Sequence, residues 1–280
     1  MHLNLNKNTY SNDAQFYDLD PREILKADIS FYLQHASKIK EKIKEDILER
    51  DILELACGTG RITIPLAEAG HNVWGLEFSE TMLEQFKKKM KGLPKKTAAK
   101  IHLVQGDMSD FQISQGFSFP LVILPCRSFQ LLYDEEKEIA CLKNVYDHLS
   151  GNGYFIIDIG NFVPNKEKED QWVSDEEFFD WENSDPKTGF KIHRTHIRKE
   201  IDTVKQIIYP QKTYCITMTG GVTEKVVKRS PWKYFFENQI RNLLVTNGFK
   251  IIEEMGYYDG RPITETNPEF IFICQKEKSC

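Results

Sequence analysis

The sequence lacks several patterns that would place it in a common functional class. None of its six cysteines forms a C-x-x-C pair, so the spacing of a zinc site is missing and reduced thiols are the simplest account of them. No apolar run approaches the roughly 20 residues of a membrane span. The polar N-terminal stretch contains no apolar core of a signal peptide. We therefore expect a cytoplasmic protein with no metal centre and no membrane contact.

An excess of basic residues is also missing. The net charge is −5, whereas binding to a phosphate backbone requires a basic face, so we expect no nucleic-acid partner. The lysine-rich stretch at 87–96 ends a predicted helix and is typical of a solvated helix end. A chain of 280 residues with 40% hydrophobic content fits one α/β domain with an insertion, as a monomer or a homodimer.

What is present is a strand–turn–helix pattern at 51–60, DILELACGTG, followed by a second strand at 73–79, VWGLEFS. Gly58 and Gly60 let the backbone approach a ligand where a side chain would collide. The second strand ends on Glu77, close to the ~20-residue offset at which a carboxylate accepts hydrogen bonds from ribose hydroxyls. This layout is typical of a nucleoside-binding βαβ unit, and the alternative is a plain βαβ turn without a ligand.

Two details indicate which nucleoside the turn would bind. A dinucleotide site needs a third small residue three positions after the second glycine, and Thr63 stands there, which disfavours a dinucleotide-dependent oxidoreductase. Glu54, on the strand before the turn, would repel a pyrophosphate but would suit a cationic ligand. S-adenosylmethionine carries an ammonium and a sulfonium and no phosphate, so the sequence favours it as the cofactor.

Three segments resemble the class I S-adenosylmethionine-dependent methyltransferases. They are ELACGTGRITIPLAEAGHNVWGLEFSETML, QGDMSDF at 105–111 and FPLVILPCRSFQLL at 119–132, and the resemblance is dense over 47–159. The motifs are similar to those of small-molecule enzymes such as sugar N-methyltransferases and glycine methyltransferases. The resemblance implies that Asp107 reaches the adenine amino group, that Met82 and Met108 line the adenine pocket, and that Tyr10 and Tyr17 cover the methionine end.

The carboxyl ends of parallel strands face the ligand crevice of an open α/β sheet, which selects most of the remaining candidates. The expected cofactor-binding residues are Tyr17, Glu54, Ala56, Cys57, Gly58, Gly60, Glu77, Phe78, Met82, Asp107, Met108, Pro125 and Arg127.

Several of these candidates have a plain structural alternative. Cys57 can be a small residue tolerated in the turn, Met82 a core residue, and Asp107 a helix cap. Arg127 can form an ion pair at the sheet edge instead of binding a ligand, and Tyr17 can pack on the surface. After the fourth strand the chain reads LPCR and not [DN]-P-P-[YFW], which disfavours adenine or glutamine as the acceptor.

Strands and helices alternate up to residue 159, which predicts a Rossmann-like, mainly parallel seven-stranded sheet with helices on both faces. Residues 160–232 then lack long helical periodicity and contain β-rich runs at 190–201, 205–219 and 222–227, which predicts a small antiparallel β insertion of three or four strands. The expected strands of the main sheet are 51–55, 72–78, 101–105, 121–124, 154–159, 249–257 and 270–275, and the expected helices are 21–36, 60–69, one that begins after Ser79, 134–149 and 234–246.

This organisation divides the chain into four parts. Residues 1–46 form an N-terminal helical cap, 47–159 the S-adenosylmethionine-binding core, and 233–280 a helix and hairpin that complete the sheet. Residues 160–232 are expected to lie across the strand carboxyl ends as the substrate lid. Trp172, Phe178, Phe179, Trp181 and Trp232 either wall the substrate pocket or pack the insertion on the main sheet.

The sequence thus predicts methyl transfer to an N or O atom of a small metabolite. Such a transfer needs a base only to free a lone pair, and the candidates are His193, His196, Tyr209 and Asp158, although a histidine within a strand is more often a surface or packing residue. A protein or RNA substrate, which the acidic charge disfavours, and a non-catalytic S-adenosylmethionine-binding protein are the alternatives.

Overall fold

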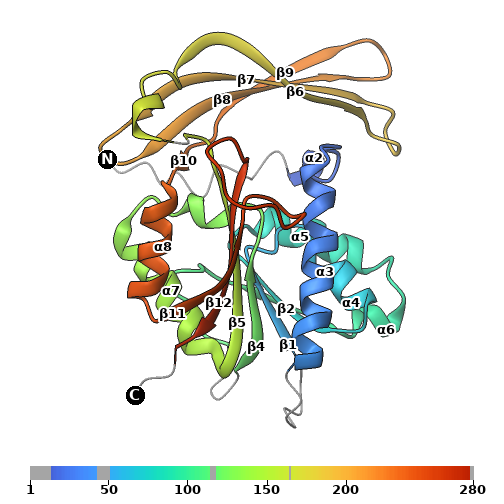
Figure 1. The fold of residues 1–280 in the computed structure, drawn as a ribbon. Helices are drawn as coiled ribbons and strands as arrows, with labels where there is room; N and C mark the ends of the chain where they lie inside the picture. The colour runs from blue at the N-terminus through green and yellow to red at the C-terminus, as the bar shows by residue number, and fades with distance from the viewer. Residues whose placement is uncertain (1–13, 43–50, 114–117, 164, 278–280) are drawn as a thin grey trace.

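The computed structural model describes residues 14–42, 51–113, 118–163 and 165–277. Within these residues, seven strands form the main sheet in the order β11-β12-β5-β4-β1-β2-β3 (Figure 1). Neighbouring strands pair in parallel except at β12, which runs antiparallel to β5 and β11. The strands are β1 Asp51–Leu55, β2 Asn72–Glu77, β3 Ile101–Gln105, β4 Phe119–Leu124, β5 Leu149–Gly160, β11 Phe249–Met255 and β12 Glu269–Lys276.

Helices cover both faces of this sheet because its central strands are apolar on both sides. Leu53 and Leu55 pack in the same hydrophobic cluster as residues of α7 and α8, whereas Ile52 packs with residues of α3 and with Phe86 of α5. These helices are α3 Ile24–Lys42, α4 Thr63–Glu68, α5 Glu80–Met90, the short α6 Lys95–Ala98, α7 Glu135–His148 and α8 Glu237–Thr246. Figure 1 shows α7 and α8 on one side of the sheet and α3 to α6 on the other.

A second, antiparallel sheet lies across the carboxyl ends of the main strands, above the short helix α2, Ala14–Tyr17 (Figure 1). The chain enters this sheet after Gly160, where β5 ends, and returns to the main sheet through α8. Its order is β10-β8-β7-β6, with β9 also paired to β8. The strands are β6 Ser174–Ser184, β7 Lys191–Asp202, β8 Ile207–Thr217, β9 Thr223–Arg229 and β10 Trp232–Lys233.

The fold class predicted from the sequence is confirmed, with corrections at particular elements. The bounds of β1 and β3 are those expected, and Ser79 caps α5 by accepting a hydrogen bond from the Met82 amide at 3.4 Å. Strand β6 was not expected because its sequence, SDEEFFDWENS, is rich in acidic residues of low strand propensity. Helix α4 begins at Thr63 and not at 60 because Gly60 has a positive φ of 84°.

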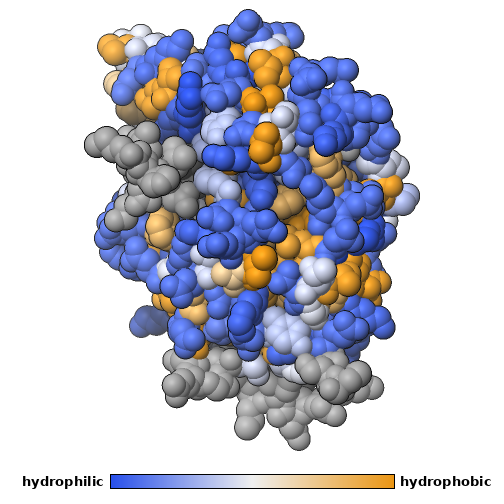
Figure 2. Space-filling model, turned by 90° about the vertical axis from the view of Figure 1, so that its left-hand side faces the viewer, coloured by the Kyte–Doolittle hydropathy of each residue, from blue (hydrophilic) through white to orange (hydrophobic). Residues whose placement is uncertain are grey.

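Figure 2 shows one face of the molecule, which is largely hydrophilic with hydrophobic residues in several separate areas. No helix within the described ranges is both long and apolar enough to cross a membrane. Tyr10 lies outside the described residues. Of the N-terminal helical cap predicted for residues 1–46, the structure describes residues 14–42, which contain α2 and α3.

Candidate functional site

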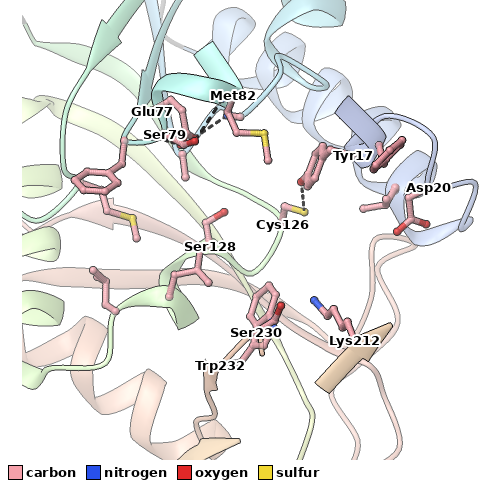
Figure 3. A pocket seen from close by; sticks show the side chains of 18 of the residues that line it. Tyr17, Asp20, Glu77, Ser79, Met82, Cys126, Ser128, Lys212, Ser230 and Trp232 are labelled. Carbon is pink, nitrogen blue, oxygen red and sulfur yellow. Dashed lines mark hydrogen bonds between the residues drawn. The ribbon is translucent and has the colours of Figure 1, made fainter. Parts of the chain in front are cut away.

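A cavity lies between the carboxyl ends of the main strands, the second sheet and the N-terminal segment. Figure 3 shows Glu77, Ser79 and Met82 on one side, Lys212, Ser230 and Trp232 on the opposite side, and Cys126 and Ser128 between them. The lining consists of Phe16, Tyr17, Asp20, Arg22, Leu25, Ala56, Gly58, Leu76, Glu77, Phe78, Ser79, Met82, Gly106, Asp107, Met108, Cys126, Ser128, Leu131, Leu132, Tyr133, Trp181, Arg194, Lys212, Tyr214, Ser230 and Trp232.

The glycine-rich turn after β1 positions a carboxylate at the cavity. Ala56 and Gly58 have positive φ values of 54° and 57°, and a Cβ on Gly58 would meet no atom within 4 Å. The Gly58 amide donates a hydrogen bond to one carboxylate oxygen of Glu77 at 3.0 Å, and the Ser79 amide donates to the other at 2.7 Å. Burial raises the pKa of Glu77, and these backbone hydrogen bonds oppose that rise. The side chain is therefore held in one orientation with its remaining lone pairs available to a ligand.

Three predicted residues of this motif do not line the cavity, which corrects the expected roles. Gly60 is close to a side chain of the protein: a Cβ there would lie 2.3 Å from the ring of Phe86. Cys57 is buried with its sulfur against Gly75, as the small-residue alternative expected. Glu54 lies beneath the turn, where it accepts a hydrogen bond from the Thr63 hydroxyl at 2.5 Å.

Burial also determines the protonation of Glu54. Loss of solvation raises its pKa to about 8, with the hydrogen bond from Thr63 and the charge of Arg61 opposing the rise. A carboxyl group that is buried and protonated near neutral pH supplies no negative charge to a cationic ligand. Glu54 does not line the cavity, so its predicted direct contact with a cationic cofactor is not supported by this geometry.

The loop after β3 forms a mixed polar and apolar end of the cavity. Met82 and Met108 line the cavity and are both buried. Asp107 accepts hydrogen bonds from the Ser109 amide at 2.9 Å and the Ser109 hydroxyl at 2.7 Å, and Lys137 lies 3.4 Å from its other oxygen. Burial opposes its ionisation, but these partners outweigh burial and lower the pKa of Asp107. This end thus offers an ionised carboxylate beside two thioethers.

The loop after β4 is fixed by Asp158 at the end of β5. The carboxylate of Asp158 accepts hydrogen bonds from the Cys126 amide at 3.1 Å, the Arg127 amide at 2.6 Å and the Tyr32 hydroxyl at 2.7 Å. Cys126 and Arg127 both have a φ of 61°, a conformation that costs energy in residues other than glycine. Asp158 itself is fully buried and outside the lining, so it positions this loop and does not reach an acceptor in the cavity.

Arg127 and Pro125, both expected at the cofactor, also lie outside the lining. The Arg127 guanidinium pairs with Glu269 of β12, with its Nε 2.8 Å from the carboxylate, and stacks over Phe162 at 5.1 Å. This is the ion pair at the sheet edge that the sequence left open as an alternative. The carbonyl of Pro125 accepts a hydrogen bond from the Ser128 hydroxyl at 2.7 Å, so Pro125 shapes the loop from behind.

The N-terminal segment is tied across the glycine-rich turn. The Tyr17 hydroxyl lies 3.5 Å from the sulfur of Cys126 at the cavity wall. Asp18 accepts a hydrogen bond from Thr59 at 2.6 Å and forms an ion pair with Lys89 of α5 at 2.9 Å. Tyr17 therefore reaches the cavity as the resemblance implied, and contacts with the turn and with α5 hold it there.

The second sheet supplies a wall that the sequence did not predict in detail. Trp181, Arg194 and Tyr214 form a compact group in which the guanidinium lies 5.3 Å and 5.8 Å from the two ring centres. Arg194 pairs with Asp180 at 2.9 Å and lies 3.5 Å from Asp20. Trp181 and Trp232 line the cavity, as one of the two alternatives expected. The sequence gave no signal for a cavity role of Arg194, because charged residues recur at every second position in any strand that has one face in solvent.

Three candidate bases are displaced from the cavity. His193 is partly exposed and lies 3.2 Å from Glu182, and His196 is bonded to Asp180 at 2.8 Å. Neither histidine lines the cavity, and neither does Tyr209. Their predicted role as bases is therefore not supported by the geometry. His193 is the neighbour of Arg194 on β7 and lies on the opposite face of the sheet. His196 shares the face of Arg194 but is bonded to Asp180 and does not line the cavity.

Comparison with known proteins gives the same assignment as the fold. Residues 52–153 match the family model of a methyltransferase domain. The chain is 34% identical over 108 residues to the putative methyltransferase YqeM of Bacillus subtilis (strain 168). These aligned residues make up 39% of this chain and 41% of that relative. The chain thus spans well under two thirds of the length of that curated relative.

Two solved structures share the fold over more than nine tenths of the chain. The CcbJ methyltransferase from Streptomyces caelestis has a TM-score of 0.72 and 17% identity, covering 96% of this chain and 97% of its own. CalS10, an amino pentose methyltransferase from Micromonospora echinaspora, was solved with S-adenosylmethionine bound. It has a TM-score of 0.65 and 16% identity, covering 91% of this chain and 92% of its own. At these identities the likeness shows the fold alone.

Proposed function

We propose, from the premise that this chain contains a class I S-adenosylmethionine-dependent methyltransferase domain, that the protein transfers a methyl group to an N or O atom of a small molecule. One observation carries the proposal. A single cavity joins the Glu77 side of the glycine-rich turn to an aromatic and charged wall from the second sheet. A cofactor and an acceptor bound at these two ends would share one enclosed space.

The cofactor end fits the chemistry of an adenosyl group. The Glu77 carboxylate is buried, held by two amides and directed at the cavity, as a pair of ribose hydroxyls requires. Asp107 supplies an acceptor for the exocyclic amino group of adenine, and Met82 and Met108 supply apolar surface for the adenine ring. Gly58 leaves open space where a side chain would intrude. These features carry the cofactor assignment without the charge of Glu54.

Methyl transfer from a sulfonium requires little covalent chemistry from the protein. When bound, the sulfonium cofactor supplies an electrophilic methyl carbon and a good leaving group for an in-line displacement. The residues of the chain then align the acceptor and exclude water. Tyr17 closes one side of the cavity beside Cys126, and the second sheet closes the opposite side.

A dedicated base is not required by this arrangement. At the acceptor end the lining contains one carboxylate, Asp20, and it is held by Arg22 at 2.7 Å and Arg194 at 3.5 Å. Desolvation and nearby cations both lower the pKa of an amine, so they favour the neutral form whose lone pair attacks. The acceptor end would thus bind an amine in its reactive form.

A small acceptor is favoured because the second sheet covers the opening that a protein or RNA chain would need. The structural neighbour CalS10 acts on an amino pentose, which is consistent with this size class. The test is a turnover assay with S-adenosylmethionine and pooled small metabolites, followed by mass identification of the methylated product. Turnover supports the proposal, whereas binding of S-adenosylmethionine without turnover on any pool would indicate a sensor.

A further inference from the structure

Two stretches of chain connect the second sheet to the main sheet, and both pass beside Gln130. The chain enters the second sheet after Gly160, the last residue of β5, and leaves it after Lys233, the last residue of β10. Figure 1 shows β10 between the second sheet and α8. Gln130 belongs to the short 3₁₀ helix η1, Ser128–Leu131, which follows β4, and it is fully buried.

The side-chain amide of Gln130 bonds both connections. The Gly160 amide donates a hydrogen bond to Gln130 Oε1 at 2.7 Å. Gln130 Nε2 donates to the Gly160 carbonyl at 3.2 Å and to the Lys233 carbonyl at 2.7 Å. Both N–H groups of the amide are thus used, and the reversed amide would set its oxygen against two carbonyls. Backbone groups of the two connections therefore fix the orientation of this side chain.

The entry connection needs a partner from outside the strands. Leu124, the last residue of β4, pairs with Ile157 of β5, so the parallel pairing ends before Gly160. On its other side Gly160 pairs with Glu269 of β12. Toward β4, the Gln130 amide takes the place of a further strand residue. Without it, buried backbone groups at the entry would lose their hydrogen bonds, which costs free energy.

The exit connection has two other contacts with the main domain. The Tyr133 hydroxyl donates to the Pro231 carbonyl at 2.9 Å, and the Lys233 ammonium pairs with Glu138 of α7. Both of these contacts are made to the exit. Of the three side chains that hold the exit, Gln130 is the one that also bonds the entry.

We propose that Gln130 is a positioning residue that sets the distance between the acceptor wall of the second sheet and the cofactor end of the main sheet. Trp232, next to Lys233, lines the cavity from the second sheet, and Ser128, two residues before Gln130, lines it from the loop after β4. A shift of about 1 Å between the two walls can cost about 100-fold in the rate of transfer. This inference rests on the proposed function and adds to its site a residue that lies outside the cavity.

The first readout separates the transfer rate from cofactor binding. Gln130→Met keeps the length of the side chain and removes its amide, whereas Gln130→Asn keeps an amide that is one methylene too short to span both connections. We expect both variants to lower kcat at least about tenfold, measured with the acceptor that the metabolite assay identifies. The dissociation constant of S-adenosylhomocysteine should stay within about twofold of wild type.

The matched control is Val145→Ala. Val145 is buried in α7, near the end of the helix that leads into β5, at the edge of the sheet opposite the cavity. Its truncation lowers stability through lost packing and leaves the Gln130 bonds in place. If a general loss of stability caused the effect, Val145→Ala would lower kcat as much as the Gln130 variants do at equal melting temperature.

The second readout needs no acceptor. Cys126 lies at the cavity wall beside Tyr17, and burial raises the pKa of its thiol, so alkylation by iodoacetamide should be slow in wild type. A displaced second sheet would open the cavity, and Gln130→Met should alkylate at Cys126 at least about tenfold faster. Cys215, next to Tyr214 on β8, points to the other face of that sheet and serves as the internal reference.

A kcat within about twofold of wild type in both Gln130 variants would overturn the proposal. So would an alkylation rate at Cys126, relative to Cys215, that is the same in Gln130→Met and wild type. Failure of the proposed function is distinguishable, because it would appear in the wild-type protein as no binding of S-adenosylhomocysteine or no turnover. In that case the alkylation rates still decide whether Gln130 holds the second sheet in place.

Discussion

Glu77 offers the sharpest perturbation of the cofactor end. Its carboxylate is fixed by the amides of Gly58 and Ser79 and is directed at the cavity, so it can accept hydrogen bonds from two ribose hydroxyls. We expect Glu77→Ala to weaken binding of S-adenosylhomocysteine strongly. The variant should retain the fold, because its amide partners border the cavity, where water can replace the lost carboxylate.

The magnitude follows from the bonds that are lost. A hydrogen bond to a charged group contributes about 1.5–3 kcal/mol. Water entering the space left by the side chain recovers part of the two bonds, so we take the net loss as that of one. The dissociation constant should therefore rise by about 10- to 150-fold.

The assay is isothermal calorimetry with S-adenosylhomocysteine at constant salt. The matched control is Glu80→Gln, which removes a carboxylate from the exposed first turn of α5, three positions away. Thermal unfolding of each variant without ligand shows whether the fold is retained. The pH dependence gives a second readout: burial raises the pKa of Glu77, so wild-type affinity should fall as the pH drops through that raised pKa.

An unchanged dissociation constant in Glu77→Ala would remove Glu77 from the cofactor site. An equal loss in Glu80→Gln would show that the effect is one of general charge and not of the bonds described.

Three other predictions test the surroundings of the site. Burial raises the pKa of Glu54 to about 8, so between about pH 4.5 and pH 8 the folded state holds a proton that the unfolded state releases. The stability that this proton gives to the folded state is lost as the pH rises through that range, so the unfolding free energy of Glu54→Gln, measured with urea, should depend less on pH than that of the wild type. Gly60→Ala should lower the unfolding free energy by about 1–3 kcal/mol through contact with a ring. Gly58→Val should also lower it, because the positive φ of Gly58 strains a side chain, and should in addition abolish binding of S-adenosylhomocysteine; normal binding by Gly58→Val would contradict the assignment. Asp18→Asn loses an ion pair and should weaken cofactor binding by about two- to fivefold, with faster amide exchange at 14–20; unchanged exchange would show that this contact does not hold Tyr17 in place.

The sequence predicts the main sheet well because most of its strands contain a short apolar run next to turn residues. The run DILEL and the glycine-rich turn after it specify β1 and its connection to α4 with little dependence on distant contacts. The position of Glu77 follows in the same way, since the end of β2 determines it. The local sequence pattern was sufficient to place a cavity residue where that residue lies at the end of a strand that the same pattern predicts.

The acceptor end depends on contacts between segments far apart in the chain, and here the sequence was a weaker guide. Asp20 meets Arg194 only because the N-terminal segment lies under the second sheet. Arg127 is drawn away from the cavity by Glu269 on β12. His196 is held by Asp180 on the adjacent strand. Such pairings decide which charged side chains reach the cavity, and no spacing within one segment reveals them.

Cofactor identity is the central claim, and a binding comparison tests it most directly. Purified protein is titrated by calorimetry with S-adenosylmethionine, S-adenosylhomocysteine and NAD under identical conditions. We predict saturable one-site binding of the two adenosyl compounds and no binding of NAD, because Thr63 stands where the dinucleotide pattern needs its third small residue, while Glu77 remains placed for the ribose of an adenosyl group. Binding of NAD, with no binding of either adenosyl compound, would contradict the account.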